Sequence, residues 1–406
     1  MTTPFSPDGF LDHWLRLLPQ MPDMSAETHD EAEAEEATEE HASLITIRDF
    51  APNPGALWMR AFLPDDLPEA APLVVVLHGC RQSAAEYLDG SGWGTLAERH
   101  GFALLLPEQR RFNNPQLCFN WFETEDIARD TGEAASIAAM IRTLTARYGL
   151  DPKRVYITGL SAGGAMANAM LASYPELFAG GAIIAGLPYG SAASAHEAFG
   201  VMGQGRVRSA EELGARVREA SAYPGPWAPV TIWQGKADHV VNPVNAEELA
   251  KQWADVMGLG DVAPEHGSPD GVERLVWRNA AGRTAVTLYR IPDLGHAVPI
   301  NPDAALPDAR IGLPGASPFI LPAPISSTWQ IAEGWGLVKA GQVARSTQHT
   351  HQRQEMAGPA FWHWLLPDAE RVEHFARELA GDGTPLGRLL RAGGITPPGG
   401  DPPEKR

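Results

Sequence analysis

Short apolar runs alternate along the chain with longer amphipathic segments, which is the pattern that strands and helices give in βαβ units. Residues 73–77 (LVVVL) are continuously apolar, as expected for a strand that is buried on both faces. Residues 133–148 combine strong helix formers with apolar side chains at helical spacing, and they predict a helix that packs against the sheet. Further strands are predicted at residues 43–50, 56–63, 103–106, 155–158, 182–185, 230–233, 273–278 and 286–291.

This alternation predicts an α/β fold, with a twisted, mostly parallel sheet of about eight strands and helices on both faces. In such a sheet, ligands and catalytic residues gather at the carboxyl ends of the strands. We expect this domain to span residues 43–340. Residues 1–42 predict an amphipathic helix followed by an acidic flexible linker, and residues 341–406 predict a helical extension with a flexible tail.

Composition excludes several classes of protein. Asp and Glu outnumber Lys and Arg by 50 to 32, and the net charge of −18 has the wrong sign for a nucleic-acid partner. No apolar run approaches the roughly 18 residues of a membrane span, and no secretory signal is visible, so a cytoplasmic location is expected. Cys80 and Cys118 are too few for a disulfide scaffold and wrongly spaced for a structural zinc site. Composition does not indicate the oligomeric state.

A nucleophile motif follows the predicted strand at residues 155–158. Residues 159–163 (GLSAG) match G-x-S-x-G, and small residues that can open a helix come next. A nucleophile elbow needs this context, because a tight turn holds the serine in a strained conformation while glycines allow close approach of the backbone. We therefore predict Ser161 as the nucleophile of an α/β-hydrolase fold, in preference to a Gly/Ser turn without chemistry.

A serine hydroxyl needs a base, and in this fold the carboxylate and then the histidine follow the serine along the chain. His296 lies in a loop after the predicted strand at 286–291, where it can act as general base. Asp238 follows the strand at 230–233 and is predicted to accept the Nδ1 proton of His296. Asp293 is the rival carboxylate, although its place in the same tight loop suits it better to shaping the turn.

Negative charge that develops on a substrate oxygen needs preorganised donors, usually two backbone amides. The amide of Ala162, directly after the predicted nucleophile, supplies one of them. The other is expected from the loop after residues 73–77, where Cys80 follows a His-Gly turn whose His78 is expected to be structural. This chemistry needs no metal ion and no organic cofactor.

Four segments carry a resemblance to a known family. They are residues 78–82 (HGCRQ), 113–122 (NNPQLCFNWF), 159–164 (GLSAGG) and 186–190 (GLPYG). In this order they resemble the polyhydroxybutyrate depolymerase family of esterases, which also includes feruloyl and acetylxylan esterases. The resemblance covers roughly residues 44–337 and implies that Ser161, Asp238 and His296 hold the triad positions of the family, with Cys80 at its oxyanion position.

The resemblance implies further features near the site. The cysteines that match Cys80 and Cys118 are commonly bonded in that family, and adjacent free thiols are the alternative here, since cytosolic thiols stay reduced. Residues 301–324 look like a proline-rich insertion near the mouth of the site, and we interpret them as a candidate lid. Three aromatic side chains are candidates for lining a substrate groove, with core packing as the alternative for the first two: Trp121, Phe122 and Tyr189.

The expected function is hydrolysis of carboxylic esters through a serine acyl-enzyme, with short hydroxyalkanoate esters or oligomers as substrates. A feruloyl or acetylxylan-type esterase is the alternative within the class. Two hypotheses from other classes are a peptidase with the same triad and a non-catalytic binding protein on the same fold. The binding protein predicts a broken triad, whereas all three members are present in this sequence.

Overall fold

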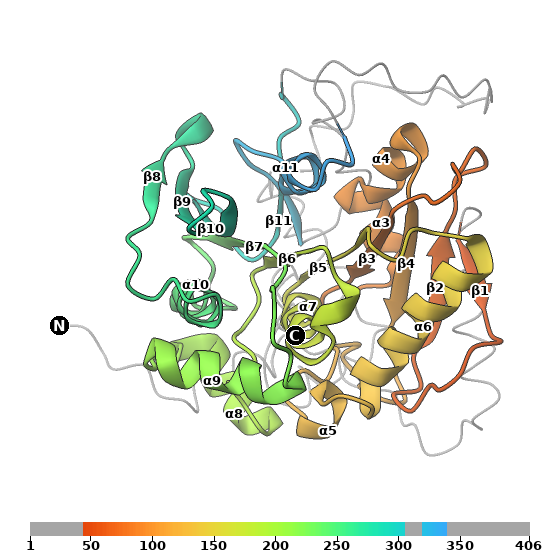
Figure 1. Ribbon diagram of the computed structural model, residues 1–406, viewed down its shortest axis with the longest axis horizontal. Helices are drawn as coiled ribbons and strands as arrows, with labels where there is room; N and C mark the ends of the chain where they lie inside the picture. Colours follow the sequence, from red (N-terminus) through yellow and green to blue (C-terminus); the bar gives the residue numbers. More distant parts are fainter. Residues whose placement is uncertain (1–43, 305–318, 339–406) are drawn as a thin grey trace, which may run out of the picture. The chain divides into compact units, whose positions relative to one another are not determined.

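Ten strands form the main sheet of the computed structural model, which describes residues 44–304 and 319–338. The described residues all belong to one unit of the chain, residues 1–346. They have the α/β fold that the sequence predicts (Figure 1). The predicted N-terminal helix, acidic linker and C-terminal extension lie outside the described residues, so the expected domain boundaries at 43 and 340 stay predictions.

The strands lie in the order β1-β2-β4-β3-β5-β6-β7-β10-β9-β8. The six strands from β4 to β10 in this order are parallel, and the outer strands pair antiparallel. The bounds are β1 Ile45–Ile47, β2 Trp58–Phe62, β3 Leu73–Leu77, β4 Ala103–Glu108, β5 Val155–Leu160, β6 Gly180–Ile184, β7 Val230–Gly235, β8 Glu265–Gly267, β9 Glu273–Arg278 and β10 Thr284–Ile291. Strand β8 is not predicted from the pattern, because its three residues carry no alternation of apolar side chains.

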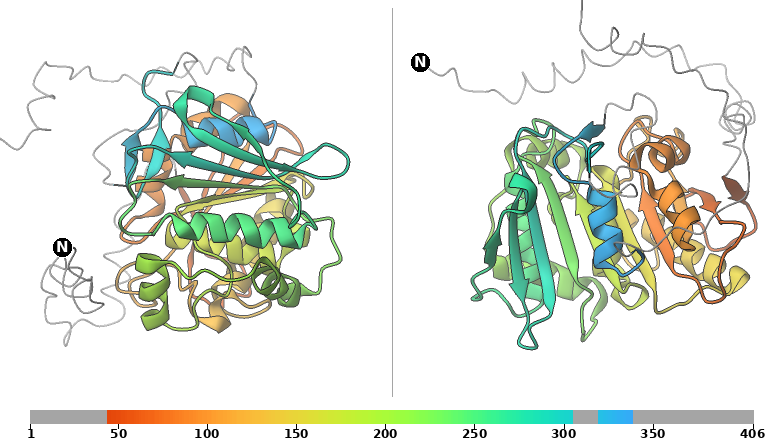
Figure 2. Two further views of the ribbon diagram at one scale, coloured as in Figure 1. Left: turned by 90° about the vertical axis from the view of Figure 1, so that its left-hand side faces the viewer. Right: turned by 90° about the horizontal axis from the view of Figure 1, so that it is seen from above.

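Helices cover both faces of the sheet, as Figure 2 shows. In β3, Leu73, Val75 and Leu77 pack into one apolar cluster with helices α6 (Gly132–Tyr148), α7 (Ala162–Ser173) and α10 (Val244–Val256). Val74 and Val76 point to the opposite face and pack with helices α3 (Ala84–Ser91), α4 (Trp93–His100) and α11 (Ser327–Gly334). Both faces of β3 are therefore buried, which explains its unbroken apolar run.

The helices follow the predicted alternation with the strands. The long helix expected at residues 133–148 is α6, and the small residues after the elbow motif open α7. The bounds of the described helices are α3 Ala84–Ser91, α4 Trp93–His100, α5 Thr124–Ile127, α6 Gly132–Tyr148, α7 Ala162–Ser173, α8 Ala195–Gln204, α9 Ala210–Ser221, α10 Val244–Val256 and α11 Ser327–Gly334. Two short 3-10 helices are η1 Pro175–Leu177 and η2 Pro269–Gly271.

Two short strands stand apart from the main sheet. β11 (Val298–Ile300) and β12 (Ile320–Pro322) pair in parallel on either side of residues 305–318. Most of the candidate lid at residues 301–324 thus lies outside the described residues, so its role as a lid stays a prediction.

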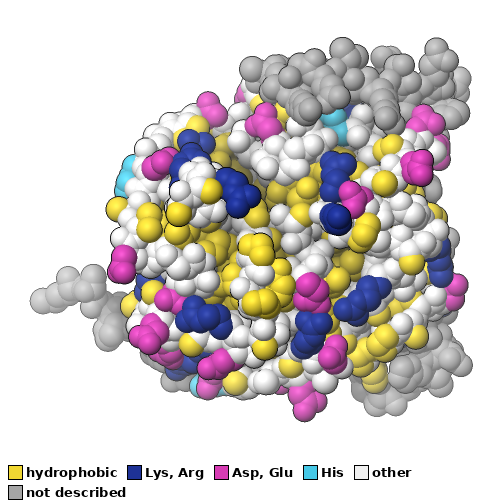
Figure 3. Space-filling view, in the orientation of Figure 1, with side chains coloured by type: hydrophobic (Ala, Val, Ile, Leu, Met, Phe, Trp, Pro, Cys, Tyr) yellow, Lys and Arg dark blue, Asp and Glu magenta, His cyan; other side chains and the backbone are white. Residues whose placement is uncertain are grey.

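The described surface carries mixed charge. On the face drawn in Figure 3, Lys and Arg side chains are interspersed with Asp and Glu and form no continuous basic stripe. Among the helices that the structure describes, none is both long enough and apolar enough to cross a bilayer.

Candidate active site

Ser161 occupies a sharp turn between β5 and α7. Its backbone has φ 57° and ψ −119°, and the positive φ is unfavourable for a residue with a Cβ atom. The amide of Ser161 donates to Ile184 O at 2.9 Å, which holds the turn against the end of β6. The residue is only 5% exposed. A strained, buried serine between a strand and a helix is the geometry of a nucleophile elbow.

The turn is possible because of Gly163, on the first turn of α7. A Cβ atom there would stand 2.4 Å from the carbonyl oxygens of both Leu77 and His78. The N-terminus of α7 therefore packs directly against the end of β3. Ala162 is the first residue of α7, so its amide has no acceptor within the helix. The contact at Gly163 brings this amide next to the loop that carries Cys80.

Asp238 and His296 meet in a direct hydrogen bond. His296 Nδ1 lies 2.8 Å from Asp238 Oδ2, and the carboxyl side chain is fully buried. The other oxygen of Asp238 accepts from the amides of Val240 and Val241, each at 2.8 Å. Gln234 Nε2 also donates to Oδ2 at 3.0 Å. Four donors surround this carboxyl group, and they hold it in one orientation.

The rival carboxylate lies elsewhere in the same loop. Asp293 is exposed and has φ 55°, a conformation that Asp tolerates in turns. No contact joins it to His296 within the described residues. The hydrogen bond of His296 therefore goes to Asp238, and Asp293 shapes the turn.

The strand registers bring these loops to one edge of the sheet. Leu160, Ile184, Trp233 and Tyr289 are aligned from β5 to β10 through the successive pairings. Because these strands are parallel, the loops after β5, β7 and β10 leave the sheet on the same side. Ser161, Asp238 and His296 lie on these three loops. Among the described residues, the Ser161 hydroxyl makes no hydrogen bond in this structure.

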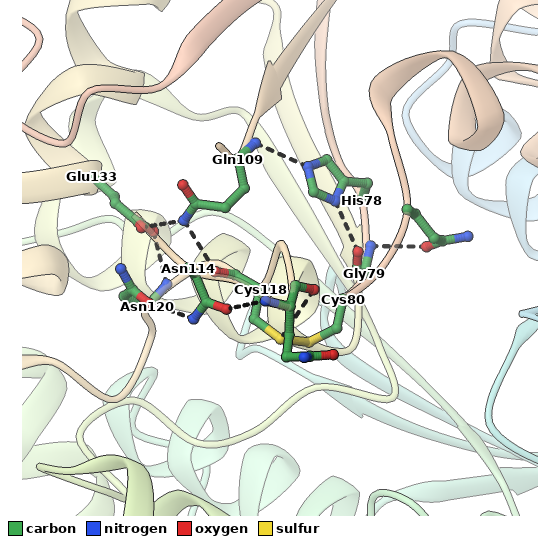
Figure 4. Close-up of a disulfide and its surroundings, with 10 residues drawn as sticks. His78, Gly79, Cys80, Gln109, Asn114, Cys118, Asn120 and Glu133 are labelled. Atoms are coloured by element: carbon green, nitrogen blue, oxygen red, sulfur yellow. Dashed lines mark hydrogen bonds between the residues drawn. A yellow bond between two sulfur atoms is a disulfide. The ribbon is translucent and has the colours of Figure 1, made fainter. Parts of the chain in front are cut away.

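The loop after β3 is held by several bonds, which Figure 4 shows. Cys80 and Cys118 form a disulfide, so the structure has the bonded alternative rather than free thiols. The amide of Arg81 donates to Gln116 O at 2.8 Å, beside this bridge. His78 is buried, and burial lowers the pKa of its imidazole. The expectation of a structural role for His78 agrees with these surroundings.

The three aromatic candidates differ in position. Trp121 is 6% exposed and packs in the core with Phe122 edge-on to it, at 5.6 Å between ring centroids. Trp121 therefore takes the packing alternative, whereas Phe122 is only partly buried. Tyr189 is partly buried against the apolar core, and its amide donates to Gln252 Oε1 at 2.9 Å. Its role in lining a substrate groove stays a prediction.

Sequence reasoning missed Phe319. Its ring lies edge-on to His296, with centroids 6.2 Å apart and an interplanar angle of 82°. The Phe319 carbonyl accepts from Val298 N at 2.9 Å, so the pairing of β11 and β12 fixes its place. The sequence predicted residues 301–324 near the mouth of the site, but it did not single out residue 319, because its contact with residue 296 depends on this separate pair of strands.

The described residues contain no group of three or more His, Cys, Asp or Glu side chains that could hold a metal ion. The arrangement instead offers a strained serine, a histidine bonded to a buried carboxyl group, and backbone amides at a helix N-terminus. Such a combination defines the α/β-hydrolase class.

Comparisons with known proteins give the family. The model described as Esterase PHB depolymerase matches residues 58–273. The chain is 38% identical over 297 residues to poly(3-hydroxyalkanoate) depolymerase C of Paucimonas lemoignei, across 73% of this chain and 70% of that protein. It is 28% identical over 274 residues to feruloyl esterase B of Talaromyces funiculosus, across 65% of this chain and 76% of that protein.

A solved structure supports the fold. The acetyl xylan esterase from Aspergillus awamori superposes with a TM-score of 0.62 at 23% identity, across 73% of this chain and 100% of that chain. The chain therefore belongs to the polyhydroxybutyrate depolymerase family of esterases. It is a serine-dependent hydrolase of carboxylic esters.

Proposed function

We propose that this chain hydrolyses short hydroxyalkanoate esters or oligomers, with Ser161 as nucleophile, His296 as general base and Asp238 as the residue that orients the base. The observation that carries the proposal is the 2.8 Å bond between His296 Nδ1 and Asp238 Oδ2. An ionised carboxyl group only accepts hydrogen bonds, so Nδ1 donates its proton and Nε2 keeps a free lone pair. That lone pair is the base that a serine hydroxyl needs.

Acylation follows from this arrangement. Ser161 Oγ attacks the ester carbonyl carbon while His296 Nε2 takes the hydroxyl proton. The tetrahedral intermediate collapses, the bond to the alcohol oxygen breaks, and the imidazolium returns the proton to the leaving alcohol. In free enzymes the bond between nucleophile and base is often long and tightens when substrate binds, so the lack of a Ser161 hydrogen bond is compatible with this step.

Deacylation repeats the sequence with water. His296 removes a proton from water, the resulting hydroxide attacks the acyl carbon, and Ser161 leaves with the proton that His296 returns. The amides of Ala162 and Cys80 are the proposed donors to the oxyanion in both steps. Among the described residues, the Cys80 amide donates to no protein acceptor, which leaves it available for this role.

An apolar ring lies beside the proposed base. Phe319 lies edge-on to the imidazole, and Phe122 is partly buried next to the disulfide loop. The depolymerase relative is more similar in sequence than the feruloyl esterase relative, at 38% against 28% identity. The higher identity to the depolymerase supports hydroxyalkanoate esters over aryl esters as substrates.

Replacing Ser161 with Ala tests the reaction. The variant should keep the circular dichroism spectrum of the wild type and lose turnover of a p-nitrophenyl ester by about 10⁴-fold or more. Retained turnover would refute Ser161 as nucleophile. A p-nitroanilide peptide, tested beside the ester, separates an esterase from a peptidase.

A substrate panel tests specificity. Hydroxybutyrate oligomers, methyl ferulate, acetylated xylan and p-nitrophenyl esters are compared by kcat/KM. The proposal expects the highest values on hydroxybutyrate oligomers, and a preference for ferulate or acetylated xylan would transfer the assignment to those classes.

The cytoplasmic location stays a prediction, and the Cys80–Cys118 bond is relevant to it. Disulfides persist in oxidising compartments, whereas a reducing cytosol favours free thiols. Thiol labelling of the protein taken directly from its cells would distinguish the two states.

A further inference from the structure

A buried carboxyl group outside the proposed triad lies close to the Cys80 loop. Glu133, near the start of α6, is 1% exposed. Its Oε1 accepts from Gln109 Nε2 at 2.5 Å, and its Oε2 accepts from the amide of Asn120 at 2.9 Å. Burying a carboxyl group is costly unless it is well partnered. The proposed ester hydrolysis does not itself use this group.

The bonds of Glu133 continue through Gln109 to His78 (Figure 4). The amide of Gln109 lies 3.1 Å from His78 Nε2, and it can only donate. Nε2 therefore accepts, so the proton of the neutral imidazole is on Nδ1. Nδ1 in turn donates to the carbonyl of Gly79 at 2.8 Å.

This last bond sets the direction of the Cys80 amide. The carbonyl of Gly79 and the N–H of Cys80 belong to the same peptide group, which is planar, and in a trans peptide the two point in opposite directions. Holding the Gly79 carbonyl toward His78 therefore aims the Cys80 N–H the other way. The amide of Gly79 is held separately, because it donates to Gln82 Oε1 at 2.9 Å.

The disulfide connects the same loop to Glu133 by a second route. Gln109 Nε2 also donates to the carbonyl of Cys118 at 3.0 Å, and Asn120 lies two residues after that cysteine. Cys118 is bonded to Cys80. Both routes to Cys80 thus start at one carboxyl group.

We propose that Glu133 is a positioning residue of the ester hydrolysis, which aims the Cys80 amide at the oxyanion through Gln109 and His78. The inference rests on the proposed function, since it assumes that the Cys80 amide is an oxyanion donor. Glu133 acts on the transition state more than on the bound ester, because negative charge on the carbonyl oxygen develops only during the reaction.

The test compares Glu133→Gln with Glu248→Gln. Glu248, on α10, is also buried, at 2% exposed. Its carboxyl group accepts from Arg208 N at 2.8 Å and pairs with Lys251 Nζ at 2.5 Å, and neither partner belongs to the Cys80 loop. In Glu133→Gln, an NH₂ group replaces one acceptor oxygen and faces a donor. We expect kcat on a p-nitrophenyl ester to fall about 10- to 100-fold with KM within about 3-fold, while Glu248→Gln keeps kcat within about 2-fold.

A second variant keeps the test decisive if Glu133→Gln does not fold. Gln109→Met removes the side-chain link but keeps the backbone amide that bonds His78, and it should lower kcat in the same way. The double variant should lose little more than either single variant, because both changes break one route.

The proposal is overturned if Glu133→Gln keeps kcat within about 3-fold, if KM alone changes, or if Glu248→Gln loses as much kcat. Additive losses in the double variant would also overturn it. Failure of the proposed function is seen separately, as turnover retained by Ser161→Ala.

Discussion

Gly235 and Leu294 touch through their backbones. A Cβ atom on Gly235 would stand 2.2 Å from the carbonyl oxygen of Leu294, closer than any real Cβ contact. Two residues later, the amide of Ala237 donates to the same oxygen at 3.0 Å. The loops that carry Asp238 and His296 are therefore joined at this point, and the missing side chain of Gly235 is what allows them to meet.

Replacing Gly235 with Ala should separate these loops. The new methyl group must displace the backbone at Leu294, so we expect a loss of about 1–3 kcal/mol in unfolding free energy. We also expect kcat to fall about 10-fold or more, since His296 moves with its loop. Urea denaturation and ester kinetics measure the two effects. Gly260→Ala is the control, because a Cβ atom there meets nothing within 4 Å. Equal behaviour of the two variants would contradict this account.

Asp238→Asn should disable the base without unfolding the protein. An amide in place of Oδ2 would donate to His296 Nδ1, which forces the opposite tautomer and leaves no lone pair for Ser161. We expect kcat to fall about 10⁴-fold with little change in KM. Asp293→Asn is the matched control, because Asn tolerates the φ of 55° at that position. The assignment of the carboxylate would be wrong if Asp293→Asn were the more damaging change.

The buried Glu133 should make stability depend on pH. Burial, with repulsion from Asp126, raises the pKa of Glu133 to about 8 from an ordinary value of 4.5. Since the folded pKa lies above the unfolded one, the folded state holds the proton more tightly. This contribution to stability is complete below about pH 4.5 and is lost as the pH rises to about 8, with a total on the order of a few kcal/mol.

Glu133→Gln tests this dependence, because an amide does not titrate. Its unfolding free energy should change less than that of the wild type between about pH 5 and about pH 8.5. Urea denaturation at several pH values gives the comparison, and Glu248→Gln serves as the control. Parallel curves for the wild type and Glu133→Gln would show that Glu133 does not cause the slope.

The disulfide should contribute to both stability and rate. Cys80 and Cys118 are 38 residues apart in the sequence, and a cross-link of this kind stabilises by about 2–4 kcal/mol. A variant with both cysteines replaced by Ser should therefore unfold at lower urea concentration and show a lower kcat. A reductant should lower the melting temperature of the wild type and leave that of the double variant unchanged. No response of the wild type to reductant would speak against this role.

Several features follow from local sequence alone. The unbroken apolar run of β3 predicts burial on both faces, and the G-x-S-x-G motif after a buried strand predicts the strained turn at Ser161. These predictions succeed because the cause lies within a few neighbouring residues. Glu133 also left a local signal that was not used, since it lies four residues before Ile137, on the buried face of α6.

Other features depend on segments that only the folded chain brings together. The choice of Asp238 over Asp293 depends on how two loops pack across Gly235, and the place of Phe319 beside His296 depends on the pairing of β11 with β12. The route from Glu133 to Cys80 joins α6 to the loops after β3 and β4 through hydrogen bonds. Periodicity and motifs report the local conformation of the backbone, whereas these contacts are set by distances between strands that are far apart in sequence. For this reason local sequence predicts the class of fold and the candidate nucleophile, whereas contacts between distant segments set the residues that surround Ser161.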